Sequence, residues 1–428
     1  MSAAVRLRST VSEAVGGLPR AFWWLWTSTL VNRLGGFVVT FLALYLTGDR
    51  GFSPAYAGLV ASLFGLGSAI AAVAGGVLAD RWGRRPTLLV AQLGTAVSTA
   101  VLGFCQDRAA IAVTAFLVGL ASNASRPAVS AIIADLVPAE HRVRAYSLNY
   151  WAINIGFGVS AAVAGLIAAH GYLALFLLDA ASTLACAVVV FARVPESRPD
   201  RPSAPSGAAD GPVPAEPGAG LGTVFRDGRF MALVAVNLLL AVVAQQGSTT
   251  LAVDMGLAGI SAARYGLVIG LNGVLIVVLQ LPLTRAMEGR GRTGLLVASA
   301  LLTGWGFGLT ALAGGSAGFY AFTVAVWTIG EIMAAPTMMG LVAELSPARA
   351  RGRYQGVYSL SWSLASFVGP AAGGYLLEHA GGRAVWGACA VFGTVAAGAF
   401  LLLGRRPAAA PADALPAEAA PSAELSRS

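Results

Sequence analysis

Apolar residues fill twelve long stretches of the chain, and short polar segments separate them. Each stretch has about 20 residues or more, and a helix of that length, rising 1.5 Å per residue, crosses roughly 30 Å of hydrocarbon. Strict alternation over about ten residues, the pattern of a membrane β-barrel, is not seen in them. The pattern therefore predicts an all-α polytopic membrane protein. The predicted spans are 21–47, 55–79, 87–106, 109–134, 145–169, 171–193, 230–256, 262–284, 293–314, 318–344, 353–378 and 382–404.

Three segments lie outside the predicted spans. Residues 194–229 hold seven prolines among Ser, Asp, Gly and Ala, a composition that cannot bury a core and that indicates an extended linker. Residues 1–20 form an N-terminal segment, and the Ala/Pro-rich tail 405–428 is predicted to be disordered. The helical part is thus divided into an N-terminal half, 21–193, and a C-terminal half, 230–404.

The two halves resemble each other in sequence. A shift of 209 residues superimposes several pairs, namely Pro127 on Pro336, Asp135 on Glu344, Pro138 on Pro347, Arg142 on Arg351, Arg144 on Arg353, Gly165 on Gly374 and His170 on His379. Two six-helix units with the same orientation form a parallel repeat, and such repeats place a substrate site at mid-membrane between them.

Charge is sparse and unevenly placed. Charged residues make up 11% of the chain and hydrophobic residues 57%, and all 28 basic residues are Arg. Our count places 22 of them in the segments on one side of the predicted spans and four in the loops on the other side. By the positive-inside rule the richer side is cytoplasmic, so both termini are expected in the cytoplasm of a multi-pass inner-membrane protein. The net charge of +8 is therefore a topology signal, and nucleic acid is not an expected partner.

The segment after the second span carries a recognisable motif. It reads Gly76-Val-Leu-Ala-Asp80-Arg81-Trp-Gly83-Arg84-Arg85-Pro-Thr-Leu-Leu89. This resembles, at every defining position, the loop signature G-x-L-A-D-R-x-G-R-R-x-x-x-L of the major facilitator superfamily, and the resemblance covers roughly residues 20–404. It implies a twelve-helix transporter that works by alternating access, with a cytoplasmic gate at this loop.

The chemistry of the motif fits a gate. Glycines 76 and 83 permit close packing and a tight turn, Asp80 can face the positive N-terminus of another helix, and Arg84 can reach Asp135. The alternative is that these arginines only set the topology. The loop from Arg285 to Arg292 in the second half lacks Asp-Arg-x-Gly, so an asymmetric gate is expected. The predicted gate consists of Gly76, Asp80, Arg81, Gly83, Arg84, Arg85, Asp135 and Arg144.

Two further resemblances point to branches of the superfamily. Gly369-Pro370-Ala-Ala-Gly373-Gly374 in span eleven is similar to the G-P-x-x-G-G of drug/proton antiporters, which in that branch lies in span five, and we expect a conformational hinge at these four residues. The segment from Gly330-Glu331 to Pro336 in span ten is similar to one in proton-dependent oligopeptide transporters. The acidic residues that those transporters carry in span one are absent here, so the peptide signature is incomplete.

Ionisable residues within the spans are costly unless they face a cavity or a partner. Arg33 and Glu331 both lie at mid-depth, in spans one and ten, and we expect them to face each other across the cavity, either as a functional pair or as a structural ion pair. Arg126 is expected to bond Asp135 or to reach the membrane surface. Asp179 is expected either to pack between helices or to form an outer gate. The predicted substrate- or proton-binding residues are Arg33, Glu331, Asn237, Gln245, Asn272 and Trp327.

The function that follows is secondary transport and not enzymatic catalysis. We predict proton-driven export of small amphipathic molecules by a monomer, with a small-molecule substrate, protons and the lipid bilayer as partners. The alternatives are a proton-coupled symporter for peptides or similar zwitterions and, more remotely, a sensing or lipid-handling protein on the same fold. No cofactor other than the proton gradient is expected. No metal site or disulfide is expected either, because Cys105, Cys186 and Cys389 lie in apolar runs without ligand spacing.

Overall fold

The computed structural model describes residues 17–197, 221–346 and 350–405. The segments predicted at 1–20, 194–229 and 405–428 fall largely outside these ranges. The described residues form helices throughout. Their bounds are α2 Arg20–Leu34, α3 Val38–Leu44, η1 Tyr45–Asp49, α4 Pro54–Arg81, α5 Arg84–Phe104, α6 Arg108–Leu136, η2 Ala139–His141, α7 Arg142–Ala168, α8 Tyr172–Arg193, α9 Leu221–Arg226, α10 Gly228–Gln245, α11 Thr250–Leu257, α12 Ala262–Met287, α13 Arg292–Gly308, η3 Leu309–Leu312, α14 Ala317–Leu345 and α15 Arg351–Arg405.

The prediction of twelve spanning helices is confirmed. Eleven stretches of the described residues are helical, long and apolar enough to cross a membrane. The last of them, Arg353–Gly404, counts twice, because Gly381 within α15 has a φ of 78° and the chain turns back there. Several helices begin at a side chain that accepts a backbone N–H. Ser53 and Ser261 start α4 and α12 in this way, and they occupy equivalent places in the two halves.

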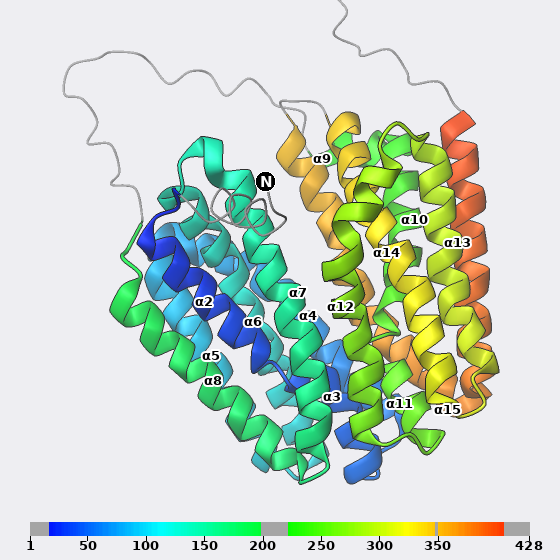
Figure 1. Cartoon of the computed structure of the whole chain (residues 1–428), viewed down its shortest axis with the longest axis horizontal. Helices are drawn as coiled ribbons and strands as arrows, with labels where there is room; N and C mark the ends of the chain where they lie inside the picture. Colours follow the sequence, from blue (N-terminus) through cyan, green and yellow to red (C-terminus); the bar gives the residue numbers. More distant parts are fainter. Residues whose placement is uncertain (1–16, 198–220, 347–349, 406–428) are drawn as a thin grey trace, which may run out of the picture.

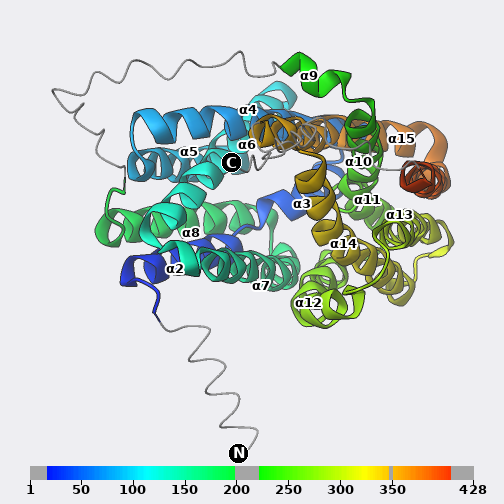
Figure 2. The ribbon, with the colours of Figure 1, turned by 90° about the horizontal axis from the view of Figure 1, so that it is seen from above.

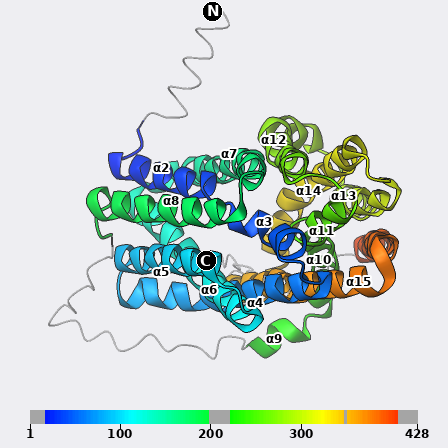
Figure 3. The same ribbon diagram turned by 90° about the horizontal axis from the view of Figure 1, so that it is seen from below.

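Figure 1 shows two lobes, α2–α8 in blue to green and α10–α15 in lighter green to red. Within the first lobe α4 packs on α6, α5 on α6 and α8, and α2 on α7 and α8; within the second, α10 and α13 pack on α15 and α12 on α14. The lobes contact each other mainly through two helix pairs, α4 with α15 and α7 with α12. Figures 2 and 3 show these pairs on opposite sides of α3.

The first and seventh spans, which the sequence pattern presents as continuous, are broken at mid-depth. The break between α2 and α3 falls at Gly35–Phe37, and the break between α10 and α11 falls at Gln246–Thr249. Backbone groups freed inside a membrane need partners, and side chains supply some of them. The Asp179 Oδ2 atom accepts the N–H of Val38 at 3.1 Å, at the start of α3. In the second half the Gln246 Nε2 atom donates to the carbonyl of Val242 at 2.9 Å, in the last turn of α10.

Among the described residues, the closest backbone approaches between the lobes lie toward the end where α4 and α12 begin, which we call the closed end. A Cβ atom added to Gly58 would lie 2.3 Å from the carbonyl oxygen of Pro370, and one added to Gly266 would lie 2.3 Å from that of Ala161. Such close approach of backbones requires glycine. At the other end, which we call the linker end because α9 lies there, Gly76 and Gly356 have no neighbour within 4 Å of an added Cβ. The structure is therefore closed at one end of the α4/α15 pair and open at the other (Figure 1).

Candidate functional site

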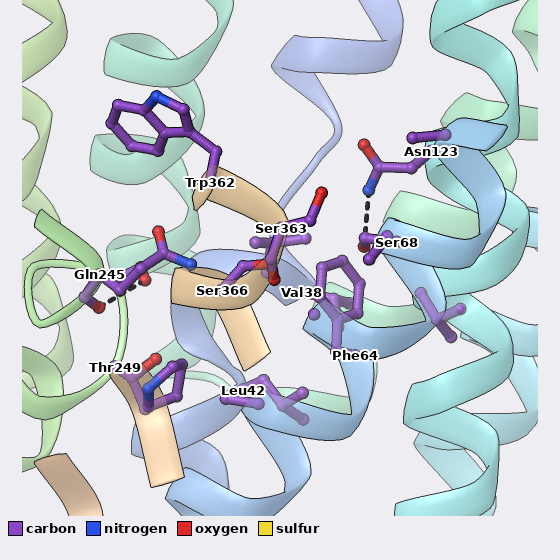
Figure 4. A pocket seen from close by; sticks show the side chains of 18 of the residues that line it. Val38, Leu42, Phe64, Ser68, Asn123, Gln245, Thr249, Trp362, Ser363 and Ser366 are labelled. Atoms are coloured by element: carbon purple, nitrogen blue, oxygen red, sulfur yellow. Dashed lines mark hydrogen bonds between the residues drawn. The ribbon is translucent and has the colours of Figure 1, made fainter. Parts of the chain in front are cut away.

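Three adjoining compartments are found in the described part of the chain: two lie between the lobes and one lies within the first lobe. The central compartment has a volume of about 520 Å³ and is lined from both halves. Val38, Leu42 and Phe64 form part of one wall, and Gln245 and Trp362 belong to the opposite wall, as Figure 4 shows. The wall from the first half also has a polar patch, where the Asn123 Nδ2 atom donates to Ser68 Oγ at 2.7 Å.

The second compartment, which we call the Glu331 compartment, has a volume of about 380 Å³ and shares Gln245 and Trp362 with the central one. Five of the six residues predicted to bind substrate or protons line it, namely Asn237, Gln245, Asn272, Trp327 and Glu331. They come from α10, α12 and α14. The structure thus brings together residues up to about one hundred positions apart in the sequence. The other residues that line the Glu331 compartment are mainly apolar.

Hydrogen bonds fix the polar groups of the Glu331 compartment. The Asn272 Nδ2 atom donates to Glu331 Oε2 at 3.1 Å and lies 3.0 Å from Thr328 Oγ1. Asn237 donates to Ser361 Oγ at 2.7 Å. The Trp327 ring stacks on Phe307 with a centroid distance of 5.0 Å. The Glu331 side chain is itself exposed to the cavity, so a proton or a ligand group can reach the carboxylate.

The third compartment, which we call the arginine compartment, lies within the first lobe and has a volume of about 360 Å³. It holds Arg33, from the last turn of α2, and Arg126 from α6. The expectation that Arg33 faces Glu331 is wrong for this conformation, because the two line different compartments and neither belongs to an ion pair found among the described residues. The break after Leu34 and the packing of Arg33 against Gly156 of α7 direct the side chain into its own half.

The expected bond from Arg126 to Asp135 is not formed. Arg126 lines both the arginine compartment and the central compartment, where its side chain is exposed. Asp135 is bonded by Arg84 and Ser197 instead, at 3.1 Å and 3.0 Å. Asp179 packs between helices, since its carboxylate accepts the Val38 N–H at the break in the first span.

The predicted gate residues lie together at the linker end of the first lobe. Arg84 contacts Asp135 at 3.1 Å and Asp80 at 3.6 Å, and its backbone N–H donates to Glu196. Gly83 has a φ of 116°, which confirms the tight turn. Arg85 donates to the carbonyl of Phe191 and stacks on its ring. These contacts lie within the first half, except that Glu196 belongs to the start of the linker.

The remaining predicted gate residues also lie at the linker end. Arg81 ends α4 and is exposed, and Arg144 lies near the start of α7 at the same end. The side chain of Asp80 is 76% exposed, and the close packing expected at Gly76 is not formed. Asp80 and Gly76 are therefore available for contacts that this conformation does not make.

The gate is more symmetric than the sequence motif indicates. Arg292 forms an ion pair with Glu344 in the second half, and these residues occupy the places of Arg84 and Asp135 in the first. The expected asymmetry is thus wrong for this ion pair. The sequence repeat already indicated a second acidic partner at this place, because Asp135 falls on Glu344 when the halves are superimposed.

The predicted hinge residues lie at the closed end, in contact with other helices. A Cβ added to Gly374 would lie 2.4 Å from the carbonyl oxygen of Pro54, and one added to Gly373 would lie 1.9 Å from Gln246 Oε1. Gly369 is similarly close to Gln245, at 2.9 Å. The four residues, Gly369, Pro370, Gly373 and Gly374, therefore allow close approach between helices, and their role as a hinge stays a prediction.

Sequence reasoning missed the polar contacts that join the lobes at the closed end. The Glu378 carboxylate accepts the N–H of Ala55 at 2.8 Å, in the first turn of α4, and the Ser62 Oγ atom accepts the N–H of Ala371 at 2.8 Å. The Tyr265 hydroxyl donates to the carbonyl of Thr40 at 3.2 Å. These residues have no motif of their own, and only the docking of the two halves makes them partners.

These features define a helical membrane transporter built from two repeated halves around a cavity that one end of the molecule closes. The chain belongs to the major facilitator superfamily, whose family model matches residues 25–258 and 248–427. It is 24% identical over 366 residues to the uncharacterised transporter YhjO of Bacillus subtilis, covering 85% of this chain and 87% of that one. It is 26% identical to the multidrug resistance protein MdtH of Cronobacter sakazakii, covering 86% of this chain and 90% of that one.

The fold is shared with solved transporters. The structure of the nucleoside transporter NupG superimposes with a TM-score of 0.74 at 15% sequence identity, covering 91% of this chain and all of the other. Membership of the major facilitator superfamily makes the protein a transporter and not an enzyme. Among the described residues no group of three or more His, Cys, Asp or Glu could hold a metal ion, and Cys105, Cys186 and Cys389 are free thiols.

Proposed function

We propose that the protein exports small amphipathic molecules across the cytoplasmic membrane in exchange for protons. The observation that carries this proposal is the Glu331 compartment. There a carboxylate stands open to the cavity beside stacked aromatic rings and two buried amides, so one wall offers a proton site and an apolar surface together. The similarity to the multidrug resistance protein MdtH supports export as the direction.

The arginine distribution supports placing the linker end in the cytoplasm. In that orientation the present conformation opens its cavity toward the cytoplasm, and substrate enters from there. Transport then requires the linker end to close and the closed end to open. Closing brings Asp80 toward the N-terminus of α15, which begins at Arg351, where the positive end of the helix stabilises a carboxylate.

Competition in one compartment couples the two fluxes. Substrate that enters from the cytoplasm displaces the proton of Glu331 into the cytoplasm, and after the substrate has left on the far side Glu331 takes up a proton there before the carrier returns. An amide in its place, Glu331→Gln, resembles the protonated form and cannot release a proton. We expect this variant to lose gradient-driven flux and to retain exchange of substrate for substrate.

Proteoliposomes that contain the dye pyranine test the coupling. Vesicles are loaded with a compound from an anionic, a neutral or a cationic phenylbutyl series and then diluted into compound-free buffer. Protein-free vesicles measure the pH change that passive leak of the neutral acid or amine causes. Exchange predicts that the wild-type protein adds acidification of the lumen to this leak as the compound leaves, and that Glu331→Gln vesicles show the leak alone. Added alkalinisation of the lumen would contradict exchange and indicate symport.

A proton-coupled symporter for zwitterions is the second candidate function. The observation in its favour is that basic side chains line a compartment in the first half while Glu331 lies in the second, so a carboxylate and an amine could be held apart. The direction of proton movement in the same vesicles, loaded with a dipeptide, distinguishes the two candidates.

A further inference from the structure

The arginine compartment combines two positive charges with no acidic lining residue. Arg33 and Arg126 both project into it, and no described residue that lines it is Asp or Glu. No hydrogen bond or ion pair joins either guanidinium to another described side chain. Two like charges at membrane depth are costly unless water or an anion faces them.

One carboxylate, Asp179, is close enough to act on Arg33 electrostatically. It makes no ion pair with Arg33, and its Oδ2 atom is engaged by the N–H of Val38 at 3.1 Å. Asp179 is buried, 7% exposed, and does not line the compartment. It therefore offsets at most one of the two positive charges, and the compartment keeps a positive excess.

The other polar groups suit an anion as well. Gln92 and Asn149 line the compartment, and each has a buried amide oxygen without a hydrogen-bond partner. Because an amide presents an oxygen and an NH₂ group on either side, rotation would turn an N–H donor toward a ligand. The hydroxyl of Ser130 adds a further donor to the same wall, whereas the hydroxyls of Ser122 and Ser125 already donate to backbone carbonyls.

The compartment leads directly into the central one. Arg126 and Ser130 line both, and the central compartment beyond them is walled by apolar side chains that include Leu42 and Phe64. A ligand whose charged group lies at the arginines can thus place an apolar body in the central compartment. The planar guanidinium groups of the two arginines match a carboxylate, whose two oxygens accept paired N–H donors.

We infer that the arginine compartment binds the carboxylate of the transported molecule, so the substrate is an amphipathic carboxylic acid in its anionic form. The inference rests on the proposed transport function and narrows its substrate class. Arg33 and Arg126 hold the carboxylate, and the apolar body lies toward Trp362 and the Glu331 compartment.

Thermal unfolding of the purified full chain in detergent tests the inference with three probes on one skeleton. The probes are 4-phenylbutyrate, its uncharged amide and 4-phenylbutylamine. We expect the carboxylate alone to raise the melting temperature. Replacing one arginine removes charge-assisted hydrogen bonds, so Arg33→Gln and Arg126→Gln should each weaken the apparent affinity for the carboxylate by roughly tenfold to a hundredfold.

Two further variants keep the test decisive. Arg126→Lys retains the positive charge without the paired N–H donors of the guanidinium, and it should bind the carboxylate with intermediate affinity. That result would show that the weaker binding of Arg126→Gln does not come from misfolding. Arg264→Gln removes an exposed arginine from the closed end and should leave binding unchanged. Equal stabilisation by the amide or the amine, no effect of the carboxylate, or full binding by both Gln variants would overturn the inference.

The transport function can fail separately. If the carboxylate binds through Arg33 and Arg126 but moves no protons or compound in vesicles, the site stands and the proposed transport is wrong. If compound-driven proton flux occurs and is unaffected in Arg33→Gln and Arg126→Gln, the transport stands and the carboxylate site is wrong.

Discussion

The two glycines at opposite ends of α4 should have opposite effects on the conformational equilibrium. Gly58 lies against α15 at the closed end, and Gly76 lies on the same helix toward the open linker end. The helices run antiparallel, with Gly58 facing Gly374 and Gly65 facing Ser366. Continuing this register from Gly65 by three turns along α4 places Gly76 opposite Gly356 once the linker end closes.

The structure gives the size of each effect. In Gly58→Ala the new Cβ would lie 2.3 Å from the Pro370 carbonyl oxygen and 3.1 Å from the Gly374 Cα, both rigid backbone atoms. Overpacking of this kind costs about 1–3 kcal/mol, and it destabilises only the conformation in which α4 and α15 are in contact at the closed end. The population ratio should therefore shift about 5- to 150-fold toward the conformation that is open at that end. In Gly76→Ala no atom lies within 4 Å, so the present conformation is unaffected and only its counterpart is disfavoured.

Pulsed electron paramagnetic resonance measures this shift. Spin labels are placed at Trp82, just after α4, and at Arg290, just after α12, in a chain whose three cysteines are replaced. Gly58→Ala should increase the short-distance population at the linker end, and Gly76→Ala should decrease it. If Gly58→Ala leaves the distances unchanged, or if Gly76→Ala shortens them, the register argument and the alternating closure of this helix pair are refuted.

Three further outcomes follow from the side-chain contacts. Because Arg33 and Glu331 line different compartments, the effects of Arg33→Leu and Glu331→Leu on the free energy of unfolding should add to within about 0.5 kcal/mol. A double mutant that recovers the stability lost in the single mutants would show a direct ion pair. Asp179→Leu should lower the free energy of unfolding by about 1.5–3 kcal/mol, because the N–H of Val38 loses its buried acceptor, and Asp179→Asn should lower it by less. Equal values for the two variants in chemical unfolding would contradict this contact. One carboxylate anion leaving as one proton enters moves two charges, which at 100 mV supply about 4.6 kcal/mol, so wild-type vesicles should sustain roughly a 2000-fold gradient of the anion, whereas Glu331→Gln vesicles should reach no proton-driven gradient.

The Glu331 compartment was largely predictable. Depth in the membrane follows from counting residues along a span, so Glu331 could be placed at mid-depth from the sequence. Polar residues in an apolar span tend to face the bundle interior, which selects Asn237, Asn272 and Gln245 as lining residues. The structure places these side chains in one compartment with Trp327.

The sequence by itself determined the twelve helices, the repeat and the mid-depth positions, because length, apolar composition and self-similarity are properties of the chain alone. The neighbours of each charge depend on rotation about a helix axis and on breaks that change this rotation. The break at Gly35–Phe37 interrupts a span that reads as continuous, and Arg33 comes to share a compartment with Arg126 instead of meeting Glu331. Only the tertiary structure decided this, and only the docking of the two halves decided which end of α4 is closed, since both ends of that helix carry the small residues that docking requires.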